Sequence, residues 1–426
     1  MRILSFVLIL TWIGCNPGSD SRLIESIQND SLFSLVKYKA LQTVKTGFNA
    51  GDGYGEVWIR DYNTFIRLSA QAFPSNELKR NLLVFFKLQG RDGNIIDGFV
   101  PRAKAGEDYD GITTDLESNF VGHKNTVETD QETSLVQAVY KFIEATGDTI
   151  ILREMVGQQT VGDRMEDAMR YLMKNRYNEK YGLIYGATTA DWGDVQPEGG
   201  WGVDISDSTH YAIDIYDNAM FIIALDNLIE LIPESAYHWQ PIRDEVAANC
   251  RKYLWDAEHQ KFIPHLYLDG SPFPADFDEN AIFYHGGTAV AIEAGLLTPE
   301  EVKNSLNRMI QDVKDAHAAS IGLTMYPVYP EGYFKNKVMG PYSYQNGGDW
   351  TWFGGRMIQQ LIRYDMVAEA YEQIQPMVQR VKANNGFYEW YTVDNQPKGS
   401  GTFRGSAGVL YDAIKMFEVY AQENNR

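Results

Sequence analysis

Twelve segments of the chain carry hydrophobic residues three or four positions apart, which is the period of an α-helix. The period is clearest at 132–145, where the apolar positions are Leu135, Val136, Val139, Phe142 and Ile143. Residues 217–231 are apolar nearly all round, which predicts a helix packed on both sides. Residues 300–313 and 366–381 each have one apolar face, which predicts helices that border solvent on the other.

The connections between these segments alternate between short and long. The short ones are 74–75, 147–160, 232–237, 297–298 and 364–365, and the long ones are 47–60, 91–130, 175–213, 255–284, 317–351 and 384–404. Loops longer than about 12–15 residues are usually functional or disordered, and these are rich in Trp, Tyr, Gly and Asp. Helical hairpins closed into a ring place every long loop on one face. The predicted fold is therefore all-α, an (α/α)6 toroid of six hairpins with short β-hairpins at 262–267 and 387–393.

The composition favours one large globular domain over 23–426. No linker or charge block divides the 426 residues, of which 44% are hydrophobic and 22% charged. The net charge of -19 argues against nucleic-acid binding, which needs a cationic surface. Aromatic rings and carboxylates suit a polyhydroxylated ligand, because rings stack on sugar faces and carboxylates accept hydroxyl protons. The seven histidines show no metal-binding spacing, so neither a metal nor another cofactor is expected.

The N-terminus is predicted to be a targeting segment. A basic start is followed by an apolar run over 3–14 that is too short for a stable membrane-spanning helix. The end of this run and Cys15 resemble the lipobox of bacterial lipoproteins. The resemblance implies a signal peptide over 1–14, lipidation of Cys15 with palmitate among the acyl groups, and a tether over 15–22. The expected location is the periplasm-facing membrane or the cell surface, with the lipid as the sole anchor. An ordinary secretory signal is the alternative, and the oligomeric state stays open.

Trp58, Arg60 and Asp61 stand together where the first long loop meets a helix. One interpretation is local: Asp61 caps the helix and Arg60 pairs with a neighbour. The other is a clamp for substrate hydroxyls, in which Arg60 donates hydrogen bonds, Asp61 accepts them and Trp58 forms a wall. These three residue types at one junction favour the clamp.

Two of the long loops place carboxylates among aromatic rings. Asp191, Trp192 and Asp194 lie together in the third long loop, and Glu389 lies among aromatic residues in the last. A desolvated carboxyl beside an indole can wait protonated as a general acid. A shielded Glu that still reaches water can act as a general base. An Asx turn and a solvent-facing Glu389 are the structural alternatives.

Further acidic and aromatic residues occur at helix starts. Asp349 is as well placed to cap a helix as to bind substrate, while Trp192, Trp350 and Trp390 are expected to form platforms for a sugar. Asp130 clusters with Glu128 before another helix. Acidic residues are common there, because the helix dipole favours negative charge at its N-terminus.

At these positions the chain resembles the six-hairpin glycosidases. Residues 58–61 are similar to the Trp-x-Arg-Asp of glucoamylases and alkaline/neutral invertases, where Arg and Asp bind the non-reducing-end sugar. The Trp192 stretch resembles a Trp-x-Asp of processing α-glucosidases and trehalases, which implies Asp194 as proton donor. Glu389 falls where a late-loop Glu supplies the base. In the invertases the proton donor instead opens a helix, and Asp130 resembles that position. Asp130 therefore stays as an alternative acid, and Asp191 is a second alternative.

The resemblance implies a glycoside hydrolase that inverts the anomeric carbon at the non-reducing end of an oligosaccharide or small glycoside. Inverting enzymes hold their acid and base roughly 6.5–9.5 Å apart. One alternative is a glycan-binding lipoprotein without catalysis. Another is a phosphorylase or an uronic-acid enzyme on the same fold. A phosphorylase needs a cationic pocket, for which Arg102, Lys104 and Arg404 are the candidates.

Overall fold

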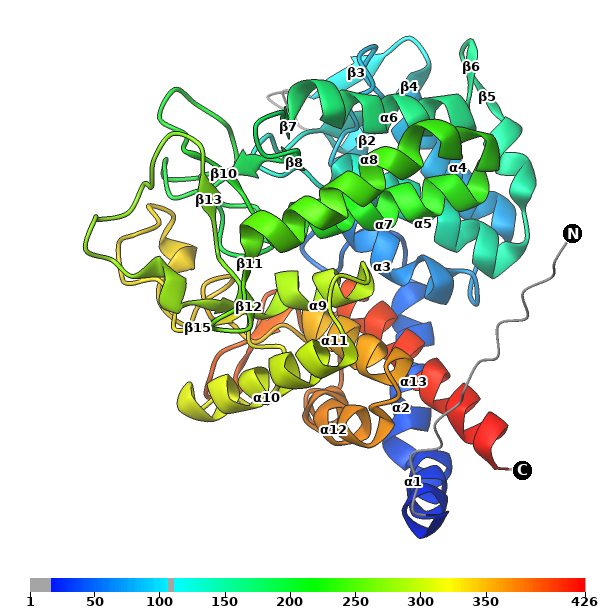
Figure 1. Cartoon of the computed structure of the whole chain (residues 1–426). Helices are drawn as coiled ribbons and strands as arrows, with labels where there is room; N and C mark the ends of the chain where they lie inside the picture. Colours follow the sequence, from blue (N-terminus) through cyan, green and yellow to red (C-terminus); the bar gives the residue numbers. More distant parts are fainter. Residues whose placement is uncertain (1–16, 106–110, 426) are drawn as a thin grey trace, which may run out of the picture.

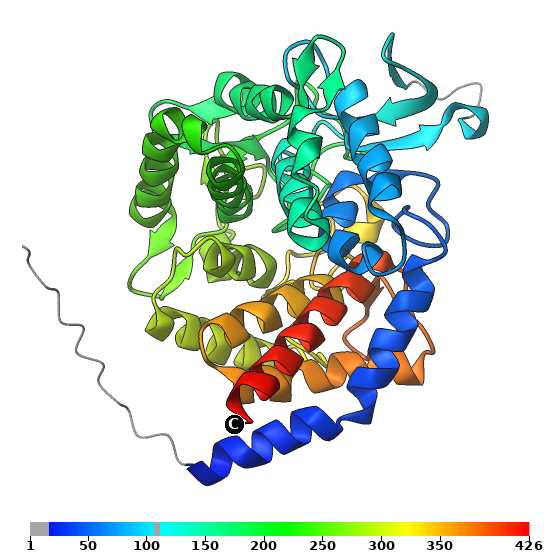
Figure 2. The same cartoon turned by 90° about the vertical axis from the view of Figure 1, so that its right-hand side faces the viewer.

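The six helical hairpins close into a ring. The computed structural model describes residues 17–105 and 111–425. The inner helices, each packed on the next and the last on the first, are α3 (Ile59–Ser69), α5 (Gln131–Thr146), α7 (Ile215–Leu231), α9 (His285–Glu293), α11 (Thr351–Arg363) and α13 (Arg404–Asn424). The outer helices are α2 (Ser31–Val44), α4 (Ser75–Lys87), α6 (Val161–Asn175), α8 (Ala236–Asn249), α10 (Pro299–Asp315) and α12 (Val367–Ala383). The predicted (α/α)6 toroid is confirmed (Figures 1 and 2).

The hydrophobic pattern decides which helices face the ring's centre. Helix α7 is buried along nearly its whole first three turns, as expected of a helix packed on both sides. Helix α10 buries one face through Val302, Leu306 and Met309. It begins at a capping box in which Thr298 and Glu301 satisfy each other's backbone amides. The inner and outer positions predicted for these segments are confirmed.

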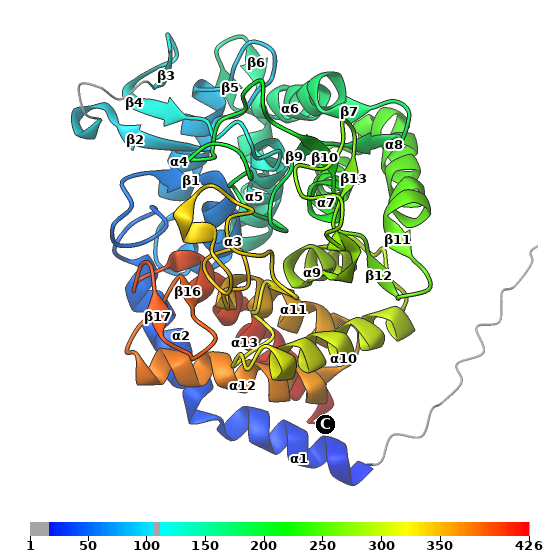
Figure 3. The ribbon, with the colours of Figure 1, turned by 90° about the vertical axis from the view of Figure 1, so that its left-hand side faces the viewer.

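Each long connection runs from an outer helix to the next inner helix. All six therefore gather at the N-terminal ends of the inner helices, on the face that Figure 3 views. A four-stranded sheet there has the order β1 (Val57–Trp58), β2 (Gly98–Pro101), β4 (Glu117–His123) and β3 (Ile112–Thr114). A three-stranded sheet has the order β13 (Leu266–Tyr267), β10 (Tyr211–Ile213) and β9 (Gly186–Ala187).

The remaining strands form two-residue pairs. They are β5 (Met155–Val156) with β6 (Gln159–Thr160), β7 (Tyr177–Asn178) with β8 (Leu183–Ile184), β11 (Trp255–Asp256) with β12 (Lys261–Phe262), β14 (Phe283–Tyr284) with β15 (Met325–Tyr326), and β16 (Trp390–Tyr391) with β17 (Pro397–Lys398). The hairpin predicted at 387–393 is present as β16–β17. The hairpin predicted at 262–267 is wrong, because the two strands in this range, β12 and β13, pair with different partners outside it.

The N-terminal part of the chain adds one helix to the six hairpins. Helix α1 (Pro17–Asn29) packs on α13 and begins inside the predicted tether over 15–22. The predicted signal peptide over 1–14 and Cys15 lie outside the described residues. Within 17–105 and 111–425, no helix is long and apolar enough to cross a bilayer.

Candidate active site

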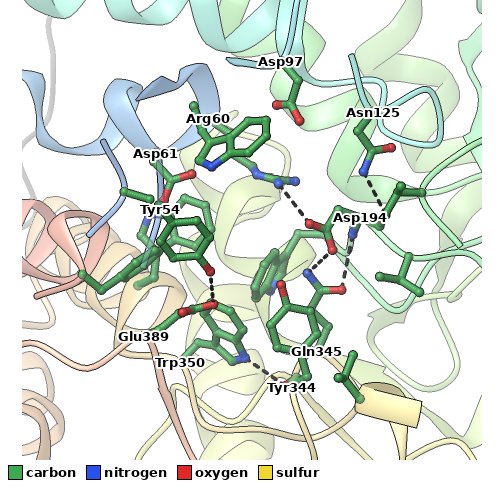
Figure 4. A pocket seen from close by; sticks show the side chains of 18 of the residues that line it. Tyr54, Arg60, Asp61, Asp97, Asn125, Asp194, Tyr344, Gln345, Trp350 and Glu389 are labelled. Atoms are coloured by element: carbon green, nitrogen blue, oxygen red, sulfur yellow. Dashed lines mark hydrogen bonds and ion pairs between the residues drawn. The ribbon is translucent and has the colours of Figure 1, made fainter. Parts of the chain in front are cut away.

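A cavity of about 380 Å³ lies on the loop face of the ring. Its walls come from the long connections and from the first turns of α3 and α11. The lining residues are Ala50, Tyr54, Trp58, Arg60, Asp61, Asp97, His123, Asn125, Trp192, Asp194, Val195, Trp201, Val203, Asn336, Val338, Tyr344, Gln345, Trp350, Trp352, Glu389 and Phe403. Figure 4 shows Glu389 and Asp194 facing this space from opposite sides.

Glu389 is buried and held by two donors. The hydroxyl of Tyr54 donates to its Oε1 at 2.9 Å, and the backbone amide of Ser400 donates to Oε2 at 3.0 Å. Gly399 has a φ of 67°, and a Cβ at this position would collide with the Glu389 carboxylate. Burial raises the pKa of Glu389, against the opposing effect of its two donors. The carboxylate is therefore oriented and made more basic.

Asp194 is the more exposed of the two carboxylates. Nε2 of Gln345 donates to its Oδ1 at 2.7 Å, and Nη2 of Arg60 lies 3.6 Å from Oδ2. The backbone is held as well, because the side-chain amide of Asn125 donates to the Asp194 carbonyl at 3.0 Å. Three separate segments thus fix this carboxyl group beside the cavity.

Arg60 and Asp61 both line the cavity. Burial raises the pKa of Asp61 to about 8, although Arg60 opposes the shift. Asp97 directly precedes strand β2 and also lines the cavity. Burial raises its pKa to about 7, although the positive charge of Arg60 opposes this shift. One carboxyl oxygen of Asp61 and one of Asp97 are buried without a hydrogen-bond partner. Two unsatisfied acceptors beside a guanidinium are suited to substrate hydroxyls.

Neither alternative acid lines this cavity. The carboxylate of Asp191 accepts hydrogen bonds of 2.7 Å from the amides of Gly286 and Gly287, which open helix α9. Asp191 is therefore used to cap that helix. Asp130 is buried behind Arg60, where it accepts a 2.6 Å hydrogen bond from the Tyr216 hydroxyl. Among the three aspartates, Asp194 alone lines the cavity.

Two predicted substrate-binding residues, Asp349 and Trp390, are not among the residues that line the cavity. Asp349 is fully buried and forms an ion pair of 2.6 Å with Arg380, supported by Ser320. Trp390 packs toward Tyr344 outside the lining. Local sequence could not show that Asp349 is buried in an ion pair, since an Asp at a helix start can either stabilise the fold or bind a substrate.

The predicted aromatic platforms differ in how much surface they offer. Trp58 lines the cavity as a half-buried wall, in an edge contact with His123 at 5.7 Å between ring centres. Trp192 and Trp350 also line it but are almost wholly buried, with their rings 4.8 Å apart. Trp192 stacks on Phe353 at 4.3 Å. These two indoles thus form the packed floor beneath the carboxylates.

The phosphate-pocket candidates do not assemble. Arg102 and Lys104 are exposed in a short 3-10 helix outside the cavity lining. The guanidinium of Arg404 is engaged by Asn49 and Thr46. Within the part of the chain that the structure describes, no cluster of His, Cys, Asp and Glu has the arrangement of a metal site.

The solved structures similar to this chain include two glycosidases. The GH63 mannosylglycerate hydrolase from Thermus thermophilus, in complex with glucose, superposes with a TM-score of 0.64 at 15% identity, over 90% of this chain and 99% of that one. A rhamnosidase from Klebsiella oxytoca with rhamnose bound gives 0.61 at 12% identity, over 91% of this chain and 64% of that one. The chain has the (α/α)6 fold of these enzymes. No protein-family profile matches the sequence, and no curated protein is significantly similar to it.

Several cavity residues of this (α/α)6 chain carry no local sequence signal. Tyr54, Asp97, Asn125 and Gln345 come from loops in which nothing distinguishes them from neighbouring polar residues. Their roles arise from contacts between loops that are far apart in sequence. The spacing of carboxylates and aromatic residues could therefore nominate Asp194 and Glu389, but not the residues that orient them.

Proposed function

We propose that this chain is a glycoside hydrolase that inverts the anomeric carbon of a small glycoside or of the non-reducing end of an oligosaccharide. The observation that carries the proposal is the pair Asp194 and Glu389, which face one cavity from opposite sides (Figure 4). Inversion needs an acid and a base on opposite faces of the sugar ring. The shared fold with glycosidases supports the same assignment.

Asp194 is assigned as the general acid and Glu389 as the general base. The protonated carboxyl of Asp194 gives its proton to the glycosidic oxygen as the bond to the anomeric carbon breaks. The ionised carboxylate of Glu389 takes a proton from the water that attacks the same carbon from the other side. Arg60, Asp61 and Asp97 bind hydroxyls of the sugar held between them.

An enzyme that uses phosphate or an anionic sugar as a substrate is less well supported. A phosphorylase or an uronic-acid hydrolase must neutralise phosphate or carboxylate. Among the described residues that line the cavity, Arg60 is the single arginine or lysine, and it already pairs with Glu128 and Asp194. The other ionisable lining residues include the four acidic residues Asp61, Asp97, Asp194 and Glu389. A neutral glycoside fits this charge distribution better.

The structural neighbours suggest which sugars to test first. One is a mannosylglycerate hydrolase, also solved with Tris and D-glycerate, and another is a rhamnosidase. The panel consists of methyl and oligosaccharide α- and β-glycosides of glucose, mannose and rhamnose, together with mannosylglycerate. Release of sugar from a soluble form beginning at Asn16 is measured, and the anomer formed first is read by NMR.

The variants decide the residue roles. Glu389→Gln and Asp194→Asn are each expected to lower kcat at least about 1,000-fold. Glu331→Gln, at an exposed loop position, is the matched control and keeps full activity. Retention of anomeric configuration would overturn the inverting mechanism. Binding of a glycoside without any turnover would instead favour a glycan-binding protein.

We also propose that the protein is exported and lipid-anchored at Cys15. The support is the short apolar run that ends at this cysteine. Wild-type protein is expected in the membrane fraction of cells, and the Cys15→Ala variant is expected to leave that fraction. Equal membrane association of both forms would contradict the anchor.

A further inference from the structure

Two exposed hydrophobic side chains line the mouth of the catalytic cavity. Trp201 is 72% exposed and Val338 is 49% exposed, and they come from different long loops. Val195, which is buried, and Val203, which is half-buried and packs against the same apolar cluster, also line the cavity. Single exposed apolar residues need no explanation, but a set on one cavity indicates a binding surface. We call Val195, Trp201, Val203 and Val338 the apolar rim.

The buried side-chain amide of Asn336 links the backbones of Trp201 and Val338. Oδ1 of Asn336 accepts a hydrogen bond of 3.1 Å from the Val338 amide, while its Nδ2 donates to the Trp201 carbonyl at 2.9 Å. The Lys335 amide also donates to the Pro197 carbonyl at 3.0 Å. The rim is therefore fixed across the two loops by specific contacts.

The rim lies on the side of the general acid. Val195 follows Asp194 directly. The side-chain amide of Asn125, in the long loop 91–130, donates a hydrogen bond to the Asp194 carbonyl. Because the acid protonates the leaving oxygen, the group bonded to that oxygen must extend past Asp194. The rim is thus where the aglycone, the non-reacting part of the leaving group, would rest.

The nearby polar side chains already have hydrogen-bond partners within the protein. Gln345 is bound to Asp194, and Oδ1 of Asn125 accepts from the Val127 amide at 2.9 Å. Few groups are left to satisfy the hydroxyls of a second sugar. An anionic group would meet the carboxylates of the cavity with no free arginine or lysine among its described lining residues.

We propose that the apolar rim is a subsite for an uncharged apolar aglycone, such as an aryl or alkyl group. Stacking on Trp201 and contact with Val338 would remove apolar surface from water. This choice separates the chain from its structural neighbour that is named for mannosylglycerate, whose leaving group is a charged glycerate. The inference rests on the proposed hydrolysis.

The test compares methyl and benzyl glycosides of the same sugar. Both release alcohols of similar acidity, so the comparison isolates the apolar contact. Wild-type kcat/KM is expected to be at least about tenfold higher for the benzyl glycoside. Trp201→Ala and Val338→Asn are each expected to bring the ratio toward one. The control Tyr237→Ala, at a 95% exposed position of α8, keeps the wild-type ratio.

Two outcomes distinguish this inference from the proposed function. Hydrolysis with equal kcat/KM for both glycosides, or with a preference for a glycerate glycoside, would overturn the subsite and leave the hydrolase standing. If none of these glycosides is cleaved, the proposed function fails. Calorimetric titration of Glu389→Gln then decides the rim: benzyl glycosides must bind at least about tenfold more tightly than methyl glycosides, and equal affinity refutes it.

Discussion

Gln345 and Asp194 hold each other through two hydrogen bonds. Nε2 of Gln345 donates to Oδ1 of Asp194 at 2.7 Å, and the Asp194 backbone amide donates to Oε1 of Gln345 at 3.3 Å. The two residues are 151 positions apart in sequence. The orientation of the proposed acid therefore depends on a loop that precedes a different inner helix.

Gln345→Ala is expected to weaken acid catalysis by releasing the Asp194 carboxyl. We expect kcat to fall about 10- to 100-fold on an alkyl glycoside. The loss should be much smaller on a nitrophenyl glycoside, because this leaving group departs without protonation. Steady-state kinetics on both substrates provide the check. Equal losses on both would show that Gln345 does not act through the acid.

Tyr54→Phe is expected to change the pH dependence through Glu389. The Tyr54 hydroxyl stabilises the ionised carboxylate, whose pKa is already raised by burial. Without this donor the pKa rises further, and activity that requires ionised Glu389 is lost at a higher pH as the solution is acidified. We expect kcat/KM to fall about tenfold at pH 5 and less at pH 7.

A pH profile of kcat/KM from pH 4 to 9 measures this shift. Tyr237→Phe removes a phenol hydroxyl at an exposed position and should leave the profile unchanged. An acidic limb in Tyr54→Phe that coincides with that of the wild type would contradict the role of Tyr54.

Asp61→Asn is expected to stabilise the protein at high pH. Burial raises the pKa of Asp61 to about 8 from an ordinary 3.8, so between these pH values the folded state keeps a proton that the unfolded state releases. Stability contributed by this group therefore falls as the pH rises from about 4 to 8. Asparagine does not titrate, so the gain in Tm should grow from pH 4 to a few degrees at pH 8.

Thermal unfolding at both pH values checks the Asp61 prediction, with Asp276→Asn as an exposed control. The same Asp61→Asn variant should raise KM about tenfold, because the clamp changes its hydrogen-bonding pattern. A gain in Tm that does not depend on pH would contradict the raised pKa.

Asp349→Ala is expected to destabilise the fold. It leaves the guanidinium of Arg380 buried and unpaired, which costs about 3–5 kcal/mol. Urea unfolding measures the loss, and the double variant Asp349→Ala/Arg380→Met should be more stable than Asp349→Ala alone. Unchanged stability together with a raised KM would return Asp349 to the substrate-binding residues.

The periodicity of apolar residues was sufficient to predict the helical ring. Helices 132–145 and 217–231 were placed within two residues of α5 and α7, because each pattern extends over several turns. The alternation of short and long connections also predicted which face carries the site. By contrast, the hairpin predicted at 262–267 is absent, because β12 pairs with the preceding strand β11 and β13 pairs with the distant strand β10.

Helix period and residue chemistry are local properties, so the order of amino acids was enough to predict the (α/α)6 architecture and to nominate Arg60, Asp61, Asp194 and Glu389. The different surroundings of Asp194, Asp191 and Asp130 became visible in the folded chain alone. All three are acidic residues in loops, and their environments are set by Gln345, by the amides that open α9 and by Tyr216. Burial and hydrogen bonding are properties of the assembled loops. The same carboxylate therefore becomes a helix cap or a proposed acid according to what folds against it.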